Sequence, residues 1–168
     1  MQTLEQALEY RNLFIGVGLD STEIGNPPSK FKLVFQMARE HGLHLVAHAG
    51  EEASAEYIWQ ALDILGVERI DHGNSAITDK ALIQRLAIDK IPLTMCPLSN
   101  LCLKILLNLT EHPAQKLLNA GVIITINSDD PAYFGGYINE NYLELANGLN
   151  LTAAELSQIA QNSFRARF

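Results

Sequence analysis

Short runs of apolar, often β-branched residues recur along the chain, and each run is followed by a segment with helical spacing. A short apolar run bounded by turn residues is typical of a buried strand, whereas apolar residues three and four positions apart indicate an amphipathic helix. The pattern predicts five strands, at residues 14–19, 44–47, 67–71, 92–95 and 122–127.

The segments between these strands predict helices, and several of them carry end signals. We expect Thr78 to cap the helix that follows it, and Gly66 and Gly121 to end the helices that precede them. Thr152 and Glu155 have the spacing of a capping box. The predicted helices cover residues 1–11, 30–41, 55–65, 113–119, 139–146 and 152–162, with a further helix that starts near Thr78.

Strands that alternate with helices form βαβ units and a parallel sheet. Five such units cannot close an eight-stranded barrel. The fold is therefore expected to be either an open α/β sheet or part of a (β/α)8 barrel whose first strands are missing. The chain has no internal repeat, linker or low-complexity tract, so residues 1–168 are expected to belong to one domain.

Composition and charge exclude several classes of function. The formal net charge of -7 argues against a surface that follows nucleic-acid phosphates and against a basic membrane patch. The 2 cysteines, Cys96 and Cys102, do not make a disulfide scaffold. Residues 1–10 lack the apolar core of a signal peptide, and no apolar run could span a bilayer. These features predict a cytoplasmic chain that binds neither nucleic acid nor membrane.

Polar residues cluster where each predicted strand ends. In parallel α/β folds the carboxyl ends of the strands form the edge at which active sites are built. One polar strand end is ordinary, but a succession of five is difficult to explain by packing. The residues concerned are Asp20, His48 with Glu51, Asp71 with His72, Ser99 with Asn100, and Asp129 with Asp130.

Several of these residue types can bind a metal ion or move a proton. His48 could bind a metal, with Glu51 beside it as a general acid. His72 could be a second ligand, or it could orient a metal-activated water. Asp129 and Asp130 are adjacent carboxylates that would repel each other unless a cation or a donor-rich ligand lay between them. Taken singly, each also fits a buried, capping or turn residue.

The remaining histidines and the cysteines give weaker signals. His41, His44 and His112 lie in helix-end or loop contexts without an acidic partner motif, so we expect them outside the site. Cys96 and Cys102 do not have the spacing of a zinc knuckle, and we expect them to pack or to line a pocket.

Taken in order, the motifs resemble those of the adenosine/adenine deaminase family. The set is His48-Ala49-Gly50-Glu51, Arg69-Ile70-Asp71-His72-Gly73, Cys96-Pro97-Leu98-Ser99-Asn100 and Asn127-Ser128-Asp129-Asp130-Pro131. Each motif alone is weak, but their order over nearly the whole chain is specific. Asp71 and the stretches 19–28 and 131–137 look more like the adenine-specific branch.

The resemblance implies a (β/α)8 TIM-type barrel of the metal-dependent hydrolase class, with one Zn²⁺ ion. It implies hydrolytic deamination of a small purine, adenine to hypoxanthine and ammonia, in purine salvage. His48 and Asp129 would be zinc ligands, Glu51 would protonate the purine ring, and His72 would orient the attacking hydroxide. Asp130 would bind the base, and the substrate pocket could also include Asp20, Ser21 and Asp71.

The chain departs from the family in lacking its His-x-His pair, which would supply two further zinc ligands. The resemblance therefore covers the C-terminal portion only, with about five of the eight βα units. We expect the chain to be inactive alone and to need a complementary N-terminal half. The alternatives are a non-catalytic fragment, a purine- or metal-binding module without turnover, and an adenosine or AMP deaminase. Glu52-Ala53-Ser54 also replaces the family's usual turn, which affects the expected loop shape.

Overall fold

The computed structural model describes residues 1–168 and contains one parallel sheet of 5 strands, in the order β1-β2-β3-β4-β5. Strands that follow each other in sequence are therefore neighbours in the sheet, as expected for successive βαβ units. The strands are β1 (Gly16–Leu19), β2 (His44–Ala49), β3 (Arg69–His72), β4 (Leu93–Met95) and β5 (Ile124–Ile126). Each overlaps a predicted strand, which confirms the parallel α/β arrangement.

Helices or short helical turns connect the strands and follow the last of them. The helices are α1 (Gln2–Leu8), α2 (Lys32–Glu40), α3 (Ala55–Gln60), α4 (Lys80–Asp89), α5 (Pro97–Cys102), α6 (Ala114–Asn119), α7 (Pro131–Phe134), α8 (Ile138–Leu149) and α9 (Ala153–Arg165). The short 3₁₀ helices are η1 (Arg11–Leu13), η2 (Pro28–Phe31), η4 (Asn74–Thr78) and η5 (Leu109–Glu111), and a π-helical turn, η3 (Ala61–Leu65), continues α3.

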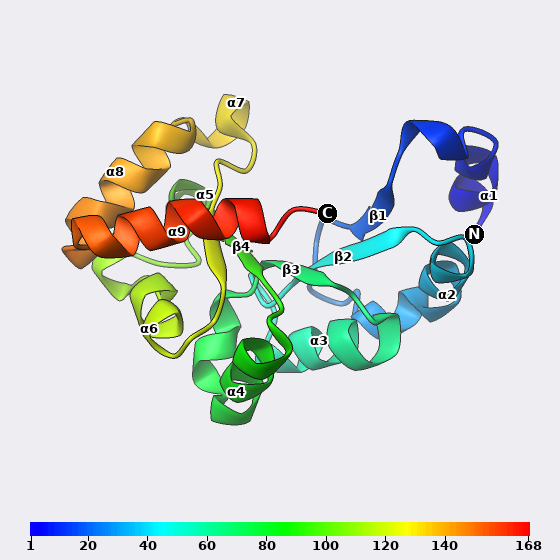
Figure 1. Ribbon diagram of the computed structural model, residues 1–168, viewed down its shortest axis with the longest axis horizontal. Helices are drawn as coiled ribbons and strands as arrows, with labels where there is room; N and C mark the ends of the chain where they lie inside the picture. Colours follow the sequence, from blue (N-terminus) through cyan, green and yellow to red (C-terminus); the bar gives the residue numbers. More distant parts are fainter.

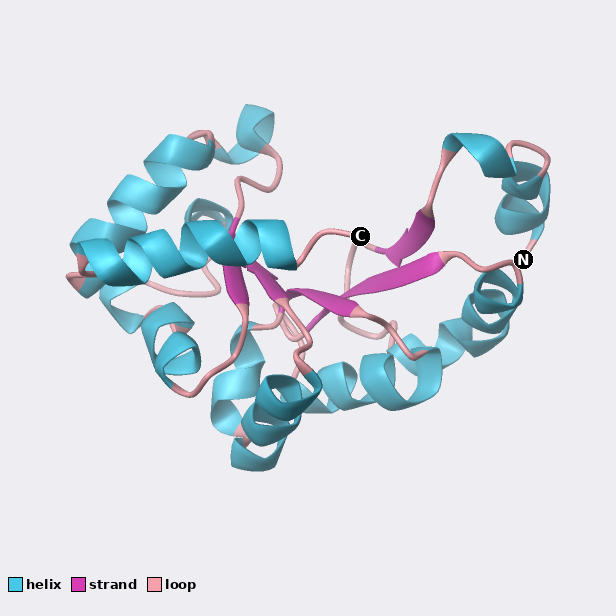
Figure 2. Cartoon of the chain, viewed as in Figure 1, coloured by secondary structure: helices cyan, strands magenta, loops and turns pink.

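One face of the sheet is apolar and is covered by helices. In β2, Leu45, Ala47 and Ala49 are buried, while the residues that alternate with them are only partly buried. The helices α2, α3, α4 and α6 lie in a row along one side of the strands (Figure 1). Helices α8 and α9 gather beside β5 (Figure 2). The buried face and its helices form a hydrophobic cluster of 27 residues, whose burial is the main favourable term for folding.

The other face of the sheet carries polar side chains. Arg69 and Asp71 in β3, Thr94 in β4 and Thr125 in β5 line a cavity of about 440 Å³. Because side chains alternate between the two faces of a strand, the same alternation that buries Leu45 directs His48 towards this polar side.

Some predicted boundaries were wrong. Thr78 does not cap α4; its hydroxyl donates to Ser75 O, and Asp79 is the cap, accepting from Ala81 N at 2.9 Å and Leu82 N at 3.1 Å. Aspartate is at least as good an N-cap residue as threonine. Because Thr78 and Asp79 are adjacent, the sequence alone does not fix which of them caps the helix. No helix was predicted at residues 97–102, where α5 begins at Pro97, a position at which a proline needs no N–H partner.

Other expectations of local structure are confirmed. Gly66 ends the α3–η3 segment in the left-handed conformation, with φ of 65°. Thr152 and Glu155 form the predicted capping box of α9. No helix in the chain is long and apolar enough to cross a membrane.

The β1 edge of the sheet is open, which leads us to expect self-association of the isolated chain. Strand β1 has one side without a strand partner and is preceded by exposed Ile15, whereas α9 packs against β5, where Asn162 Nδ2 donates to Ile124 O at 3.1 Å. Unpaired edge N–H and C=O groups favour pairing with another chain. Light scattering over a concentration series should show a rising mass, and Ile15→Lys should reduce it. A monodisperse monomer at every concentration would contradict this expectation.

Candidate active site

The polar strand ends converge on one cavity. A volume of about 530 Å³ is lined by residues from the carboxyl ends of β1, β2 and β3 and from the loop after β5. It brings together seven of the eight residues to which the family resemblance gives a role: Asp20, Ser21, His48, Glu51, His72, Asp129 and Asp130. The eighth, Asp71, lines the neighbouring 440 Å³ cavity, to which His48, His72 and Asp129 also contribute. Ser99 and Asn100, also expected at a strand end, lie in α5 and line neither cavity.

Asp71 is held by groups outside the larger cavity. Its carboxylate accepts a hydrogen bond from the Thr94 hydroxyl and lies 3.8 Å from Arg69 Nε. Both contacts involve Oδ1 of the carboxylate. Asp71 therefore lies on the polar face of the sheet, one position before His72.

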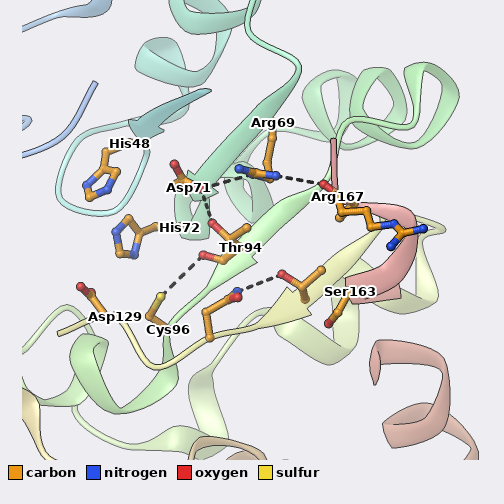
Figure 3. A pocket seen from close by; sticks show the side chains of 12 residues that line it. His48, Arg69, Asp71, His72, Thr94, Cys96, Asp129, Ser163 and Arg167 are labelled. Carbon is orange, nitrogen blue, oxygen red and sulfur yellow. Dashed lines mark hydrogen bonds and ion pairs between the residues drawn. The ribbon is translucent and has the colours of Figure 1, made fainter. Parts of the chain in front are cut away.

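His48 and His72 form the centre of the site. Their rings meet edge to face, with centroids 4.6 Å apart and an interplanar angle of 81°. Figure 3 shows both rings beside Asp129 and Cys96, on the opposite side of the view from Arg69 and Arg167. The donor atoms of His72, Cys96 and Asp129 all lie within 4.8 Å of one another, so they could surround a metal ion.

The backbone bends sharply where these side chains leave the sheet. His72 has φ of 65°, Asp129 has φ of 56° and Ser21 has φ of 72°. Positive φ is unfavourable for residues other than glycine and persists where the surroundings impose it, often at functional sites. The site thus contains three left-handed residues at the ends of three different strands.

Glu23, a residue that the sequence reasoning missed, holds the loop that carries Glu51. Its buried carboxylate accepts hydrogen bonds from the backbone N–H groups of Gly50 at 3.0 Å, Glu51 at 3.0 Å and Ala53 at 2.9 Å. Gly50 has φ of +75°, and a Cβ there would lie 2.4 Å from Ser75 Oγ. Only glycine fits, so the loop is fixed both by its conformation and by a carboxylate from the loop after β1.

Glu51 is a carboxyl group whose neutral form is favoured. Its side chain is 9% exposed. Burial, followed by the negative charges of Asp129, Glu23 and Glu52, raises the pKa of Glu51 to about 8, against a stabilising hydrogen bond from Asn100. Near neutral pH this group therefore holds a proton that it can donate.

His72 is a neutral imidazole in the metal-free chain. Burial, and then the proximity of His48, lowers the pKa of His72 to about 4, although Asp129 and Asp71 oppose the shift. Its Nδ1 lies 3.2 Å from Glu51 Oε1 but makes no hydrogen bond of good geometry. A buried ring nitrogen without a partner is available to an added ligand, ion or water.

The donor set is compatible with a metal cation. Several carboxylates surround Glu51 without a compensating positive side chain among the groups that shift its pKa. Burial and the charges of Asp129, Glu51 and Asp71 raise the pKa of the Cys96 thiol well above its usual range, so this thiol is protonated unless a cation is bound. Nitrogen, oxygen and sulfur donors in one cluster suit zinc.

The other histidines line neither cavity, as expected from the sequence. His44 is paired with Glu68 at 3.0 Å on the surface, and His41 Nδ1 lies 2.8 Å from Met37 O. His112 is buried, where Nδ1 accepts from Ala114 N at 3.2 Å and burial lowers its pKa to about 4. These three histidines have structural surroundings.

Comparison with known proteins gives matches over the whole chain. The sequence model of the family described as Adenosine deaminase matches residues 1–168. A curated adenine deaminase of Cupriavidus necator is 58% identical over 166 residues, which are 99% of this chain and 47% of that protein. One from Stutzerimonas stutzeri is also 58% identical, over 99% of this chain and 52% of its own length.

Solved structures agree with the sequence matches. An adenine deaminase from Arthrobacter aurescens superimposes with a TM-score of 0.96 at 47% identity, covering 99% of this chain and 51% of that one. An amidohydrolase from Burkholderia ambifaria with bound Zn has a TM-score of 0.83 at 30% identity, covering 91% and 43%. The chain thus spans about half the length of the relatives that it matches.

Glu23→Gln should loosen the Glu51 loop. An amide has only one accepting oxygen, so at least one of the three N–H bonds is lost, at a cost of about 1–3 kcal/mol in the free energy of unfolding. Hydrogen exchange at Gly50, Glu51 and Ala53 should become faster. Glu52→Gln is the matched control, because Glu52 is exposed and accepts a single bond, from Glu23 N at 3.3 Å. Equal exchange rates in both variants would show that the Glu23 carboxylate does not hold this loop.

Glu51→Gln should stabilise the metal-free chain as pH rises. The folded pKa of Glu51, about 8, lies above the ordinary pKa of a glutamate, 4.5, so the folded state holds an extra proton between these pH values and loses stability as pH increases. The variant has no such proton, so its free energy of unfolding should exceed that of the parent chain increasingly from pH 5 to 8. Urea titrations at several pH values measure this. A pH-independent difference would refute the elevated pKa.

Proposed function

Because this chain belongs to the adenosine deaminase family, a lineage of hydrolases, we propose that it carries the acid-base half of a zinc-dependent adenine deaminase site. The observation that supports this most directly is Glu51, a buried and largely neutral acid that shares one cavity with His48, His72 and the Asp129–Asp130 pair. The reaction is the hydrolysis of adenine to hypoxanthine and ammonia, as part of purine salvage.

The chain provides about five of the eight βα units of a TIM-type barrel of the metal-dependent hydrolase class. We infer that residues 1–168 are the C-terminal part of a single barrel domain. Since the chain spans about half of its relatives' length, the proposed active enzyme includes a complementary N-terminal half.

His48 and Asp129 are the proposed zinc ligands from this chain. A bound zinc ion supplies a Lewis acid that lowers the pKa of a coordinated water towards about 7. Catalytic zinc generally has three or more protein ligands, so two are too few for tight binding. This count supports the proposal that the isolated chain is inactive and retains zinc weakly. Of this pair, Asp129 belongs to the group of donor atoms that lie within 4.8 Å of one another, and the other members of that group, His72 and Cys96, are the further donors that this chain could add.

Glu51 is the proposed general acid. Its proton passes to the purine ring nitrogen next to the amino-bearing carbon as the oxygen of water adds to that carbon. The proton of the added hydroxyl group then passes to the amino nitrogen, the C–N bond breaks and ammonia leaves. The other proton of the water restores Glu51 to its neutral form. A general acid works best when its pKa lies near the operating pH, and the pKa of about 8 meets that condition.

The remaining proposed roles concern orientation. His72, neutral and adjacent to Glu51, orients the attacking hydroxide through a ring nitrogen. Asp130 accepts a hydrogen bond from an N–H of the base, and Asp20 with Ser21 forms part of the wall of the same cavity. Asp71 lines the neighbouring cavity together with His48, His72 and Asp129, and we propose it as a further residue of the substrate pocket.

Glu51→Gln and His48→Ala separate the acid from the ligand. With the N-terminal half of an adenine deaminase supplied, Glu51→Gln should keep zinc and lower kcat by about 10²–10⁴-fold. His48→Ala should lower the zinc content first, and activity as a consequence. Zinc is measured by metal analysis after dialysis, and turnover by the conversion of adenine to hypoxanthine.

Two outcomes would overturn these assignments. Loss of zinc in Glu51→Gln with retention in His48→Ala would reverse the two roles. If the parent chain with its supplied half bound zinc but did not convert adenine, adenosine or AMP, a binding module or a non-catalytic fragment would be favoured. Turnover of adenosine or AMP in preference to adenine would favour the nucleoside or nucleotide branch.

A further inference from the structure

A chain of buried amides leads to the side chain of Glu51. Asn100 in α5 is 0% exposed, and its Nδ2 donates to Glu51 Oε1 at 2.8 Å. Asn74, in η4, is 6% exposed and donates from its Nδ2 to Asn100 Oδ1 at 2.9 Å. From the sequence, Asn100 was expected at a polar strand end, without a role of its own.

The Asn100 amide lies between two partners. Its Oδ1 accepts from Asn74 Nδ2 and its Nδ2 donates to Glu51 Oε1, while Asn74 Oδ1 is buried without a hydrogen-bond partner. If the Asn100 amide were flipped, its N–H groups would face the N–H groups of Asn74. Its oxygen would then face the Glu51 carboxylate after Glu51 has lost its proton. In the observed orientation Asn100 Nδ2 can donate to Glu51 in both protonation states, because Oε1 has a free lone pair in the neutral acid and in the carboxylate.

We propose that Asn100 is a positioning residue that keeps Glu51 Oε1 as the hydrogen-bonded carbonyl oxygen and so places the acidic proton on Oε2. This rests on the proposed role of Glu51 as general acid. In a neutral carboxyl group one oxygen carries the proton and the other accepts, so a donor fixed beside Oε1 selects the opposite oxygen.

The same hydrogen bond limits the rise in the pKa of Glu51. Burial and three neighbouring carboxylates favour the neutral acid, and the bond from Asn100 is the interaction that favours the carboxylate. Since a donor stabilises the carboxylate more than the neutral group, Asn100 also makes Glu51 a better proton donor.

Asn100→Asp tests this assignment with nearly unchanged shape. The variant keeps an oxygen for Asn74 and replaces the donor facing Glu51 by an acceptor. The titration of the Glu51 carboxyl is followed by ¹³C NMR or infrared spectroscopy on the purified chain, with Glu51→Gln to identify its signal. Its midpoint should move upward by about one pH unit or more, since a donor to a charged group is lost and a carboxyl group is added.

Asn162→Asp is the matched control. Asn162 is another buried asparagine, 2% exposed, but its Nδ2 donates to Ile124 O at 3.1 Å, in β5. The variant should lose stability without moving the Glu51 midpoint. Circular dichroism checks that each variant is folded.

If Asn100→Asp does not fold, Asn74→Ala provides the test. It leaves the Asn100 amide free to turn, so the Glu51 midpoint should rise by a smaller amount. An unchanged midpoint in the folded variant, or equal shifts in Asn100→Asp and Asn162→Asp, would overturn the proposal. The assay contains no substrate, so absence of adenine turnover would refute the proposed function without affecting this result.

Discussion

The parallel register of neighbouring strands is the constraint on which this site depends. His48 pairs with Asp71, and Ala49 pairs with His72, so the turns after β2 and β3 begin at the same level. Parallel strands end at one edge of a sheet, which brings residues that are far apart in sequence to one cavity. The apolar alternation that sets the register therefore also places the polar side chains.

Many acidic groups lie at one edge of the sheet, and two glutamates in contact with the same loop differ in their surroundings. The side chain of Glu23 accepts hydrogen bonds from three backbone N–H groups of the loop. Glu51 receives one hydrogen bond, from Asn100, and remains largely protonated because burial and neighbouring carboxylates disfavour its charged form.

Sequence patterns predicted the strands and most helices because those elements follow from local periodicity and end signals. The errors occurred where neighbouring residues have similar propensities. Thr78 and Asp79 can both cap a helix, and the choice between them depends on how η4 meets α4. The six-residue helix α5, which begins at Pro97, was missed because so short a helix carries little periodic signal.

The sequence by itself determined the parallel α/β class and the strand ends that bear His48, Glu51, His72 and the Asp129–Asp130 pair, because side-chain alternation and turn chemistry are local properties. Only the tertiary structure decided what acts on them. Glu23 reaches Glu51 N across 28 positions and Asn100 reaches Glu51 Oε1 across 49, so neither contact has a local signature. The neutral state of Glu51 was likewise decided in three dimensions, because burial and the charge of Asp129 arise only when separate strands meet.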